Sequence, residues 1–258
     1  MPRCIAFTRR VPPSIVRCEL THLAREPIDL PRANAQHRAY EHALEGLGCR
    51  IERLLDLPDQ PDSVFVEDAA IVFDEVAVIA RPGAASRRAE IASVEYALEQ
   101  WRPIVRIEAP ATLDGGDVLV AGRRVYVGIS RRTNEEAARQ LAHLLRPHGY
   151  TVAPVAVTGC LHLKSAVTLA APDTLLVNPA WIEGAALDGF HAISVDPSEP
   201  MAANVLRIGD VTLCAAAFPR TRERLEQRGI QTRPVDASEL AKAEGALTCC
   251  SLIVANTR

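Results

Sequence analysis

Short hairpins recur along this chain, each made of two stretches of alternating apolar and polar residues joined by a turn. Alternation with a period of two is typical of a strand that buries one face. The segments that show it are FVEDAAIVFDEVAVIARPG, LDGGDVLVAGRRVYVGISRRT, LHLKSAVTLAAPDTLLVNPA and AANVLRIGDVTLCAAAFPRT. A fifth segment, LTCCSLIVANTR, begins in the same way and is cut short by the C-terminus. The pattern predicts four complete hairpins and one truncated unit.

Helical segments separate the hairpins. Apolar residues spaced three and four apart predict helices at 34–47, 86–101, 133–146, 181–190 and 221–228. Ser86 is a suitable N-cap for the second helix, and Thr133 with Glu136 predicts a capping box at the start of the third. We therefore expect a repeated order of strand, strand, helix and strand.

Corresponding positions of the five units recur at a nearly constant interval. The first polar residues of the units are separated by 42 to 48 residues, and they are Glu67, Asp114, His162, Asn204 and Cys249. An interval in this range is a signature of a repeat architecture. Five units nearly fill the 258 residues, and a closed ring needs no end caps, so we expect one α/β domain over residues 1–258. In such a ring the corresponding positions meet near the axis.

Composition and charge exclude several classes of protein. Hydrophobic residues make up 48% of the chain and charged residues 24%, which is ordinary globular composition. The net charge of -3 gives no basic surface for nucleic acid or for a membrane. No apolar run approaches the roughly 20 residues that span a bilayer, and the apolar stretch near the N-terminus is shorter than in a secretory signal. A cytoplasmic protein is expected.

The seven cysteines do not suggest a structural framework. Seven is an odd number, and no CxxC spacing occurs in the chain. We therefore expect neither a set of disulfides nor a structural zinc site, and most of the thiols should be small buried groups. One thiol, at a corresponding position of the repeat, is the exception.

A thiol, an imidazole and a carboxylate share that position in three different units. Cys249 is a candidate nucleophile, His162 a candidate acid and base, and Asp114 the group that orients the imidazole. If the segment is a strand, neighbouring side chains face opposite ways, and the register selects Cys249 over Cys250. A core histidine, a turn aspartate and two buried thiols are the structural alternative. The shared register favours catalysis.

Other polar residues indicate what such a site would bind. Asp62, Glu67 and Asp68 cluster in PDSVFVED, and carboxylates suit a planar guanidinium. Arg87 and Arg132 stand at two predicted helix starts, where a cation opposes the helix dipole, so they suggest binding of a carboxylate. Solvated acids and ordinary surface arginines are the alternative. Together these residues suit an arginine derivative.

Seven segments in register resemble a known family. PDSVFVED, RPGAASRR, TLDGGDV, VGISRRTN, LHLKS, AAN and LTCCS are similar to the dimethylarginine dimethylaminohydrolases, relatives of arginine deiminases and amidinotransferases. The resemblance covers nearly the whole chain. It implies a five-bladed α/β propeller, the pentein fold, with pseudo-fivefold ββαβ units around a central channel. It also implies hydrolysis of Nω-methylated and Nω,Nω-dimethylated L-arginine to L-citrulline and methylamine or dimethylamine.

The resemblance implies a role for each catalytic residue. Cys249 would attack the guanidinium carbon and form a covalent thiouronium intermediate. His162 would protonate the departing amine and then activate water, and Asp114 would orient His162. Some bacterial members have Glu in place of this Asp. The thiolate of Cys249 would also be a site for an inhibitory zinc ion, although no cofactor and no catalytic metal are implied.

The resemblance also implies the residues that bind the substrate. Glu67 and Asp68 match contacts to the guanidinium. Residues that match contacts to the amino-acid end are Asp62, Arg87 and Arg132, with Leu20 on a flexible lid loop and Ala243 offering a backbone carbonyl.

Two alternatives stay open at this point. The first is a hydrolase of the same superfamily, such as an arginine deiminase, although the large helical insertion of bacterial deiminases is absent. The second is a non-catalytic protein that binds arginine derivatives; the presence of Cys249, His162 and Asp114 disfavours it. Whether the protein is a monomer or a homodimer is also open.

Overall fold

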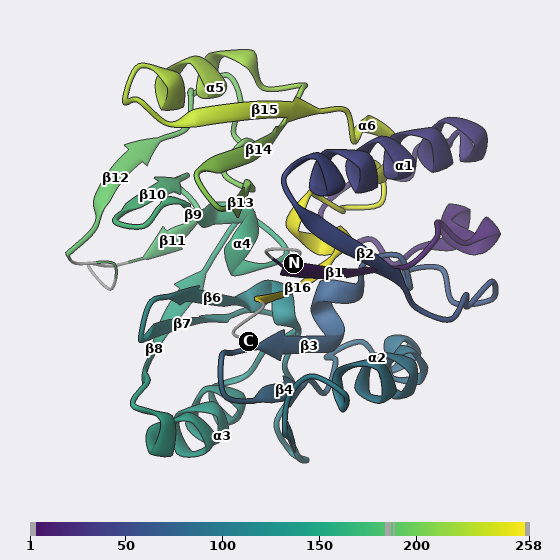
Figure 1. The fold of residues 1–258 in the computed structure, drawn as a ribbon, viewed down its shortest axis with the longest axis vertical. Coiled ribbons are helices and arrows are strands. Elements are labelled where there is room, and N and C mark those ends of the chain that lie inside the picture. The colour runs from purple at the N-terminus through teal and green to yellow at the C-terminus, as the bar shows by residue number, and fades with distance from the viewer. Residues whose placement is uncertain (1–3, 184–186, 188, 256–258) are drawn as a thin grey trace.

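The structure, a computed structural model, describes residues 4–183, 187 and 189–255, and these form an α/β fold with five small sheets (Figure 1). The sheets contain, in turn, β1 (Cys4–Thr8), β2 (Cys49–Arg53) and β16 (Leu252–Ala255); β3 (Ala70–Val72), β4 (Ala77–Ile79) and β5 (Ile104–Arg106); β6 (Val118–Ala121), β7 (Arg124–Ile129), β8 (Thr151–Val157) and β11 (Ile182–Glu183); β9 (Val167–Ala171), β10 (Thr174–Val177) and β12 (His191–Ser194); β13 (Leu206–Ile208), β14 (Val211–Ala215) and β15 (Gln231–Val235).

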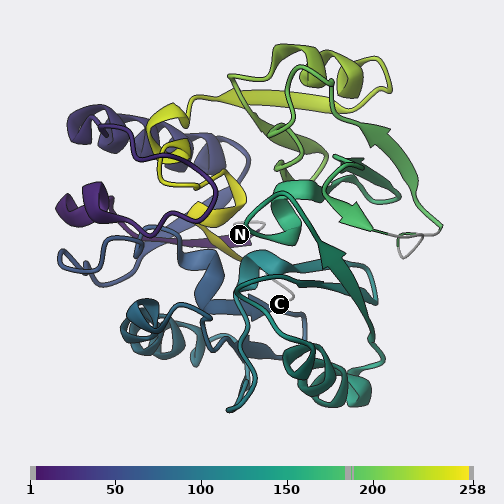
Figure 2. The ribbon, with the colours of Figure 1, turned by 180° about the vertical axis from the view of Figure 1, so that it is seen from behind.

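Every sheet repeats one pattern of pairing. A hairpin pairs antiparallel, as β3 does with β4, and the strand that follows pairs parallel to the second hairpin strand, as β5 does with β4. The longer helices connect these strands and lie on the outside of the molecule (Figures 1 and 2): α1 (Leu30–Gly46), α2 (Ile91–Leu98), α3 (Glu135–Leu145) and α5 (Pro219–Glu226). The predicted repeat of two strands, a helix and a strand is confirmed in four of the sheets, whereas the described residues between β10 and β12 contain strand β11 and no helix.

Helix α3 shows how apolar side chains hold a helix against its sheet. Its inward residues Leu141 and Leu145 are fully buried, and they pack in one cluster with Val125 and Val127 of the neighbouring strand β7. Burial of such side chains stabilises the fold by about 1.5–3 kcal/mol each. The apolar face of the helix therefore sets its position over the sheet.

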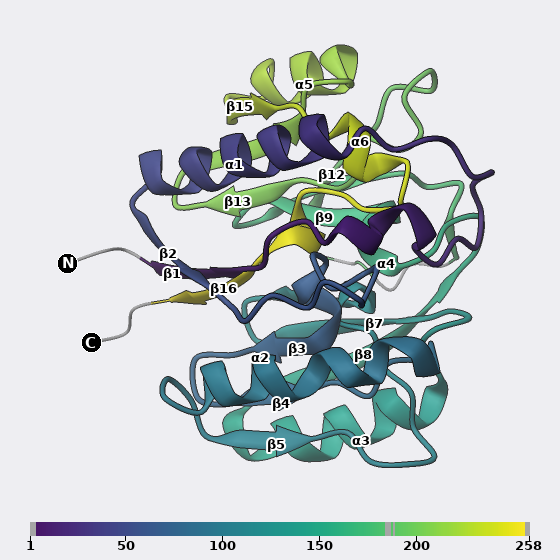
Figure 3. The same cartoon turned by 90° about the vertical axis from the view of Figure 1, so that its right-hand side faces the viewer.

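The truncated C-terminal unit is completed by the N-terminus. Strand β16 pairs antiparallel with β1, and β2 pairs parallel with β1 on its other side. Strands β1 and β16 lie side by side in the view of Figure 3. All five residues of β1 are buried, so the strand lacks the alternation by which the other hairpins were predicted.

Several predicted helix boundaries need correction. Helix α1 begins at Leu30, capped by Asp29, whose side chain accepts a hydrogen bond from the backbone N–H of Arg32. The predicted capping box at Thr133 is wrong, because the N-cap of α3 is Asn134. Ser86 does not cap α2 either, since its hydroxyl donates to Glu19 and a 3₁₀ turn precedes the helix.

The helix predicted at residues 181–190 is also wrong where the structure describes it. Ile182 and Glu183 form β11, which pairs antiparallel with β8. Residues 184–186 and 188 lie outside the described part. The remaining short helices are η1 (Pro13–Arg17), η3 (Ala85–Glu90), η5 (Arg146–His148) and α6 (Ser238–Ala241).

Four of the corresponding polar residues lie in or next to short turns, not in strands as expected, and Asn204 lies just before β13 outside any helix or strand. These turns are η2 (Val66–Ala69), η4 (Gly115–Asp117), α4 (Leu163–Ala166) and η6 (Thr248–Cys250). Asp114 and His162 are the N-caps of η4 and α4, and Cys249 lies within η6. Turn η2 contacts both η4 and η6, and α4 contacts η4, so the chain brings these polar residues together.

One pair of cysteines forms a disulfide that was not expected from the sequence. Cys4 and Cys49 form a disulfide between the parallel neighbours β1 and β2. The free thiols of the described residues are buried at Cys18, Cys160, Cys214 and Cys250, and partly exposed at Cys249. Among the described residues, no helix has the length and apolar character needed to cross a membrane.

Candidate active site

One cavity collects most of the residues that the sequence predicted. Seven of the ten predicted site residues line it: Asp62, Asp68, Arg87, Arg132, His162, Ala243 and Cys249. Five further residues complete the wall: Glu19, Phe65, Leu161, Glu244 and Gly245. Side chains from opposite ends of the chain therefore face one small space.

His162 is held between two carboxylates. Its Nε2 lies 3.1 Å from Oδ2 of Asp114, and its Nδ1 lies 3.8 Å from Oδ1 of Asp68. Burial acts to lower the pKa of His162, but the negative charges of Asp68, Asp117 and Asp114 outweigh it and raise the pKa to about 9. The imidazole is therefore protonated at neutral pH and has a proton to donate.

Asp114 lies behind His162 and is fully buried. Its second oxygen, Oδ1, accepts a hydrogen bond from the backbone N–H of Gly83 at 2.9 Å, and its own backbone N–H donates to Thr133 at 3.1 Å. Both ends of the residue are thus fixed, and Oδ2 is left directed at the imidazole. This is the geometry of an orienting carboxylate.

The glycines of LDGGD allow this close approach. A Cβ atom at Gly116 would lie 2.6 Å from Nδ1 of His162 and 2.9 Å from Oδ1 of Asp68. The backbone N–H of Gly116 also donates to Asp68 at 3.0 Å. Any side chain here would displace the imidazole, so only glycine suits the position.

Cys249 reaches the cavity from the turn η6, whereas Cys250 does not. Cys250 is 1% exposed and packs in an apolar cluster with Tyr40 and Leu44. Burial, together with the charges of Glu67 and Asp68, raises the pKa of the Cys249 thiol well above its usual value. Without substrate the thiol is therefore neutral beside an imidazolium, and a cation is needed to favour the thiolate.

Arg87 is almost wholly occupied by protein groups. Its guanidinium pairs with Asp68 and with Glu90, at 2.9 Å from Nη2 to Oε2 of the latter, and it also donates to the backbone carbonyls of Asp62 and Phe65. Burial acts to raise the pKa of Asp68, but the charges of His162 and Arg87 outweigh it and lower the pKa to about 2. Asp68 is therefore a carboxylate at any ordinary pH.

The cavity wall also holds Arg132 and Asp62, which are engaged less completely. Nη1 of Arg132 lies 3.7 Å from Oδ2 of Asp114, beyond hydrogen-bond distance. The carboxylate of Asp62 accepts from the backbone N–H of Glu19 at 3.2 and 3.3 Å, and burial raises its pKa. An anion and a cation are thus presented at one end of the cavity.

Glu67 lies on the opposite side of turn η2 from Asp68. Its carboxylate accepts from Nζ of Lys164 at 2.6 Å and from the hydroxyl of Thr248 at 2.7 Å. Thr248 is also joined to Asn204 by hydrogen bonds of 2.9 and 3.1 Å. Glu67, Lys164 and Thr248 line a second, separate cavity. The network supports the turn that carries Cys249.

Leu20 is partly buried against an apolar cluster and is not among the residues that line the reaction cavity. Its neighbour Glu19 lines the cavity instead, as does Glu244, and sequence reasoning missed both. Asp117 was also missed: it is fully buried and accepts from Ser130 and from the backbone N–H of Leu163. Its place three residues after Asp114 in LDGGD was the available signal.

The same cluster has donor groups of the kind that bind metals. One ligand atom each from Asp68, Asp114 and His162 lie within 4.8 Å of one another. Two of these residues, His162 and Asp114, already share a hydrogen bond, and the protonated imidazole is not a metal ligand until it loses its proton. The arrangement suits proton transfer without a metal.

Known proteins resemble this chain over nearly its whole length. The sequence model of the arginine deiminase family matches residues 49–203. An N(G),N(G)-dimethylarginine dimethylaminohydrolase of Streptomyces coelicolor is 41% identical over 253 residues, covering 98% of this chain and 97% of its own. The protein of that name in Pseudomonas aeruginosa is 36% identical over 236 residues, covering 90% and 91%.

Solved structures show the same likeness. The Pseudomonas aeruginosa protein, as a cysteine-to-serine variant complexed with citrulline, matches with a TM-score of 0.93 and 33% identity, over 98% of this chain and 100% of its own. The likeness therefore holds in sequence and in fold.

Proposed function

The chain belongs to the dimethylarginine dimethylaminohydrolase family, and from this premise we propose that it hydrolyses Nω,Nω-dimethyl-L-arginine and Nω-monomethyl-L-arginine. The products are L-citrulline and dimethylamine or methylamine. The observation that carries the proposal is a cavity in which Cys249, His162 and Asp68 meet. It combines a nucleophile, a proton donor and an anion for the guanidinium.

The fold that we propose is a five-bladed α/β propeller formed by a single domain. Five sheets with one pairing pattern support it, as does the pairing of β1 with β16, which joins the two ends of the chain. In a closed ring the turns that precede the hairpins meet at the centre. That arrangement explains why residues far apart in sequence face one cavity.

The first step is attack by Cys249. A bound guanidinium brings a positive charge next to the thiol, which lowers the pKa of the thiol and favours the thiolate. The sulfur forms a bond to the guanidinium carbon. As dimethylamine leaves, it takes a proton from His162, so the carbon is left as an S-alkylthiouronium on Cys249.

The second step releases the product. The now neutral His162 removes a proton from water, and the water oxygen attacks the same carbon. The carbon–sulfur bond breaks, and the electron pair returns to the sulfur as thiolate. Citrulline leaves with the oxygen of water. One water proton stays on His162, and the proton of the new hydroxyl group passes to solvent, while the thiolate regains from solvent the proton that the thiol lost when the substrate bound, so the starting state is restored. The chain's own residues and water supply every proton in the cycle.

The neighbouring carboxylates prepare these steps. Asp114 fixes one ring nitrogen of His162 and helps to keep the imidazole protonated until the amine leaves. Asp68 faces the other ring nitrogen and provides a negative charge for the guanidinium. Holding the carbon beside the thiolate supplies proximity and orientation, worth roughly 7–11 kcal/mol in favourable cases.

The amino-acid end of the substrate would lie toward Arg132 and Asp62. Arg132 suits the α-carboxylate, and Asp62 with the backbone carbonyl of Ala243 suits the α-ammonium group. Arg87 and Glu67 act indirectly, without contact to the substrate. Arg87 fixes Asp68, and Glu67 supports the turn of Cys249 through Thr248. This departs from the direct contacts that the resemblance implied for them. Contact by Leu20 stays a prediction.

Other expectations from the sequence also stay predictions. These are the cytoplasmic location, the absence of nucleic-acid partners, the choice between monomer and homodimer, and an inhibitory zinc ion at Cys249.

Citrulline release tests the function directly. The purified protein is given asymmetric dimethylarginine, monomethylarginine and arginine in parallel. We expect citrulline from the methylated substrates and little from arginine. Release from arginine alone would instead indicate a deiminase, the activity that names the matching family model. Release from none would favour a binding protein.

A further inference from the structure

A short segment of the chain crosses the edge of the reaction cavity. The lid segment, residues 18–25, lies between η1 and α1, and its residue Glu19 lines the cavity. The base of the segment is closed by Arg25, whose guanidinium donates to the backbone carbonyls of Val16 and Cys18 at 2.7 Å each. The middle of the segment, residues 21–23, is held by a residue near the C-terminal end of the chain.

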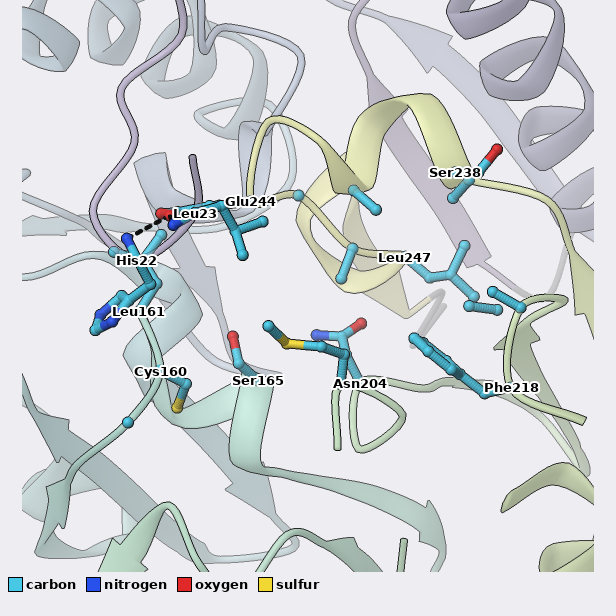
Figure 4. A pocket seen from close by; sticks show the side chains of 18 residues that line it. His22, Leu23, Cys160, Leu161, Ser165, Asn204, Phe218, Ser238, Glu244 and Leu247 are labelled. Carbon is cyan, nitrogen blue, oxygen red and sulfur yellow. Dashed lines mark hydrogen bonds between the residues drawn. The ribbon is translucent and has the colours of Figure 1, made fainter. Parts of the chain in front are cut away.

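That residue is Glu244. Its carboxylate accepts hydrogen bonds from three consecutive backbone N–H groups of the lid segment: Thr21 at 3.0 Å to each oxygen, His22 at 2.5 Å and Leu23 at 2.7 Å. Figure 4 shows Glu244 beside His22 and Leu23. These bonds join residues separated by 221 to 223 positions. Hydrogen bonds to an ionised acceptor are stronger than bonds between neutral groups.

The backbone at Glu244 is adapted to this contact at a cost. Its φ is 56°, a left-handed conformation that glycine adopts freely and that other residues rarely adopt. The following residue, Gly245, lies so close to Phe65 that a Cβ atom would be 2.1 Å from the ring. The turn is therefore fixed in place. A non-glycine residue kept in such a conformation points to a role for its side chain.

We propose that Glu244 is a positioning residue that holds the lid segment closed over the substrate. The inference rests on the proposed function. Glu244 follows Ala243, whose carbonyl we assign to the α-ammonium group, and it also borders the reaction cavity. One turn thus contacts the substrate and fixes the segment that covers it. The carboxylate itself is directed at backbone amides, so it acts through the lid.

Two variants separate this role from a merely structural one. Glu244→Gly suits the left-handed backbone and removes the side chain with its carboxylate. Glu244→Gln keeps the shape and removes the charge. We expect kcat/KM for dimethylarginine to fall about tenfold in both, mostly through KM, because the closed complex becomes a smaller fraction of the population. A purely structural role predicts that the glycine variant is unaffected or improved.

Limited proteolysis reports on the lid without relying on catalysis. Trypsin cleaves after arginine, and the exposed Arg25 ends the lid segment. We expect cleavage after Arg25, identified by mass spectrometry, to be about tenfold faster in both variants than in the wild type. Added citrulline should protect the wild type more than the variants.

Glu239→Gln is the matched control. Glu239 accepts from the backbone N–H of Asp29 at 2.9 Å, outside the lid segment, so its loss removes the same kind of bond near the start of α1. This variant should leave KM and cleavage after Arg25 unchanged.

Each outcome decides one question. Unchanged cleavage and unchanged kcat/KM in Glu244→Gly would overturn the proposal. Reduced kcat/KM with unchanged cleavage would also overturn it, since Glu244 would then touch the substrate directly. If the wild type releases no citrulline, the proposed function fails, while faster cleavage in the variants would still support the contact with the lid.

Discussion

Two adjacent carboxylates, Glu67 and Asp68, lie on opposite sides of the same turn. Asp68 contacts Arg87, the backbone N–H of Gly116 and, at 3.8 Å, His162. Glu67 contacts Lys164 and Thr248 and faces a different cavity. Both acids are buried, and two neighbouring carboxylates in one motif therefore serve two purposes.

The difference lies in the groups that surround each carboxylate. On the Glu67 side, hydrogen bonds among Glu67, Lys164, Thr248 and Asn204 form a connected network. On the Asp68 side, charges are packed around His162, whose pKa is raised to about 9. Strongly shifted ionisation is typical of functional sites, whereas satisfied networks stabilise a fold. The comparison predicts chemistry on the Asp68 side and support on the Glu67 side.

The largest expected effect comes from serine substitution of two adjacent thiols, which we expect to differ in role as the two carboxylates do. Cys249→Ser should lower kcat by a factor on the order of 10⁴ to 10⁶, because the serine hydroxyl is a far weaker nucleophile here. Cys250→Ser should leave kcat within about threefold and lower the melting temperature, since it places a hydroxyl in an apolar cluster. Steady-state citrulline release and thermal melting measure both. Loss of activity in Cys250→Ser alone would reverse the assignment.

The next effect tests the carboxylates themselves. Asp68→Asn should lower kcat/KM about 100-fold, because a buried charge that faces the substrate is lost. Glu67→Gln should lower it less than about fivefold, with a reduced melting temperature from the weakened pair with Lys164. Both are assayed well below their melting temperatures. Equal losses of kcat/KM would remove the distinction between the two sides.

The pH profile should follow the ionisation of His162. The active form has a thiolate and an imidazolium, so it holds one proton fewer than the form at neutral pH. Its population, and with it kcat/KM, should rise about tenfold per pH unit up to about pH 9 and fall after the second proton is lost. Asp114→Asn removes a charge that raises the pKa of His162, so the rise in kcat/KM should level off at a lower pH than in the wild type. An unchanged pH for the end of the rise would contradict the assignment.

The smallest effect on activity is expected far from the turns. Leu141→Ala in α3 removes a fully buried side chain and should lower the free energy of unfolding by about 2–5 kcal/mol. Because the helix lies outside the sheets, kcat/KM should change less than twofold. Denaturant unfolding and kinetics on the same sample check this. A large kinetic loss would show that the outer layer also positions the site.

The repeat and most of the candidate site were predictable from the sequence because each unit begins with a polar residue at a nearly constant interval. Asp114, His162 and Cys249 carry that signal. The N-terminal strand was not predictable in the same way, since every residue of β1 is buried. The pairing of Cys4 with Cys49 depends on the parallel neighbours β1 and β2.

The sides of the turns were not predictable either. Glu67 and Asp68 were both assigned to the substrate, and only the 3₁₀ geometry of η2 separates them. Cys249 was selected over Cys250 on the assumption that the segment is a strand, but the segment is the turn η6. The turn also directs the two thiols to different surroundings, Cys249 to the reaction cavity and Cys250 to an apolar cluster. The contact of Glu244 with the lid segment joins opposite ends of the chain, and no local pattern indicates it.

Trapping the intermediate tests the central claim most directly. The enzyme is mixed with excess asymmetric dimethylarginine, quenched in acid within milliseconds to seconds, digested, and mapped by mass spectrometry. The account predicts a transient adduct on Cys249, with the mass of the substrate less dimethylamine, and an unmodified Cys250. An adduct on Cys250, or citrulline formed at full rate with no adduct at any quench time, would contradict it.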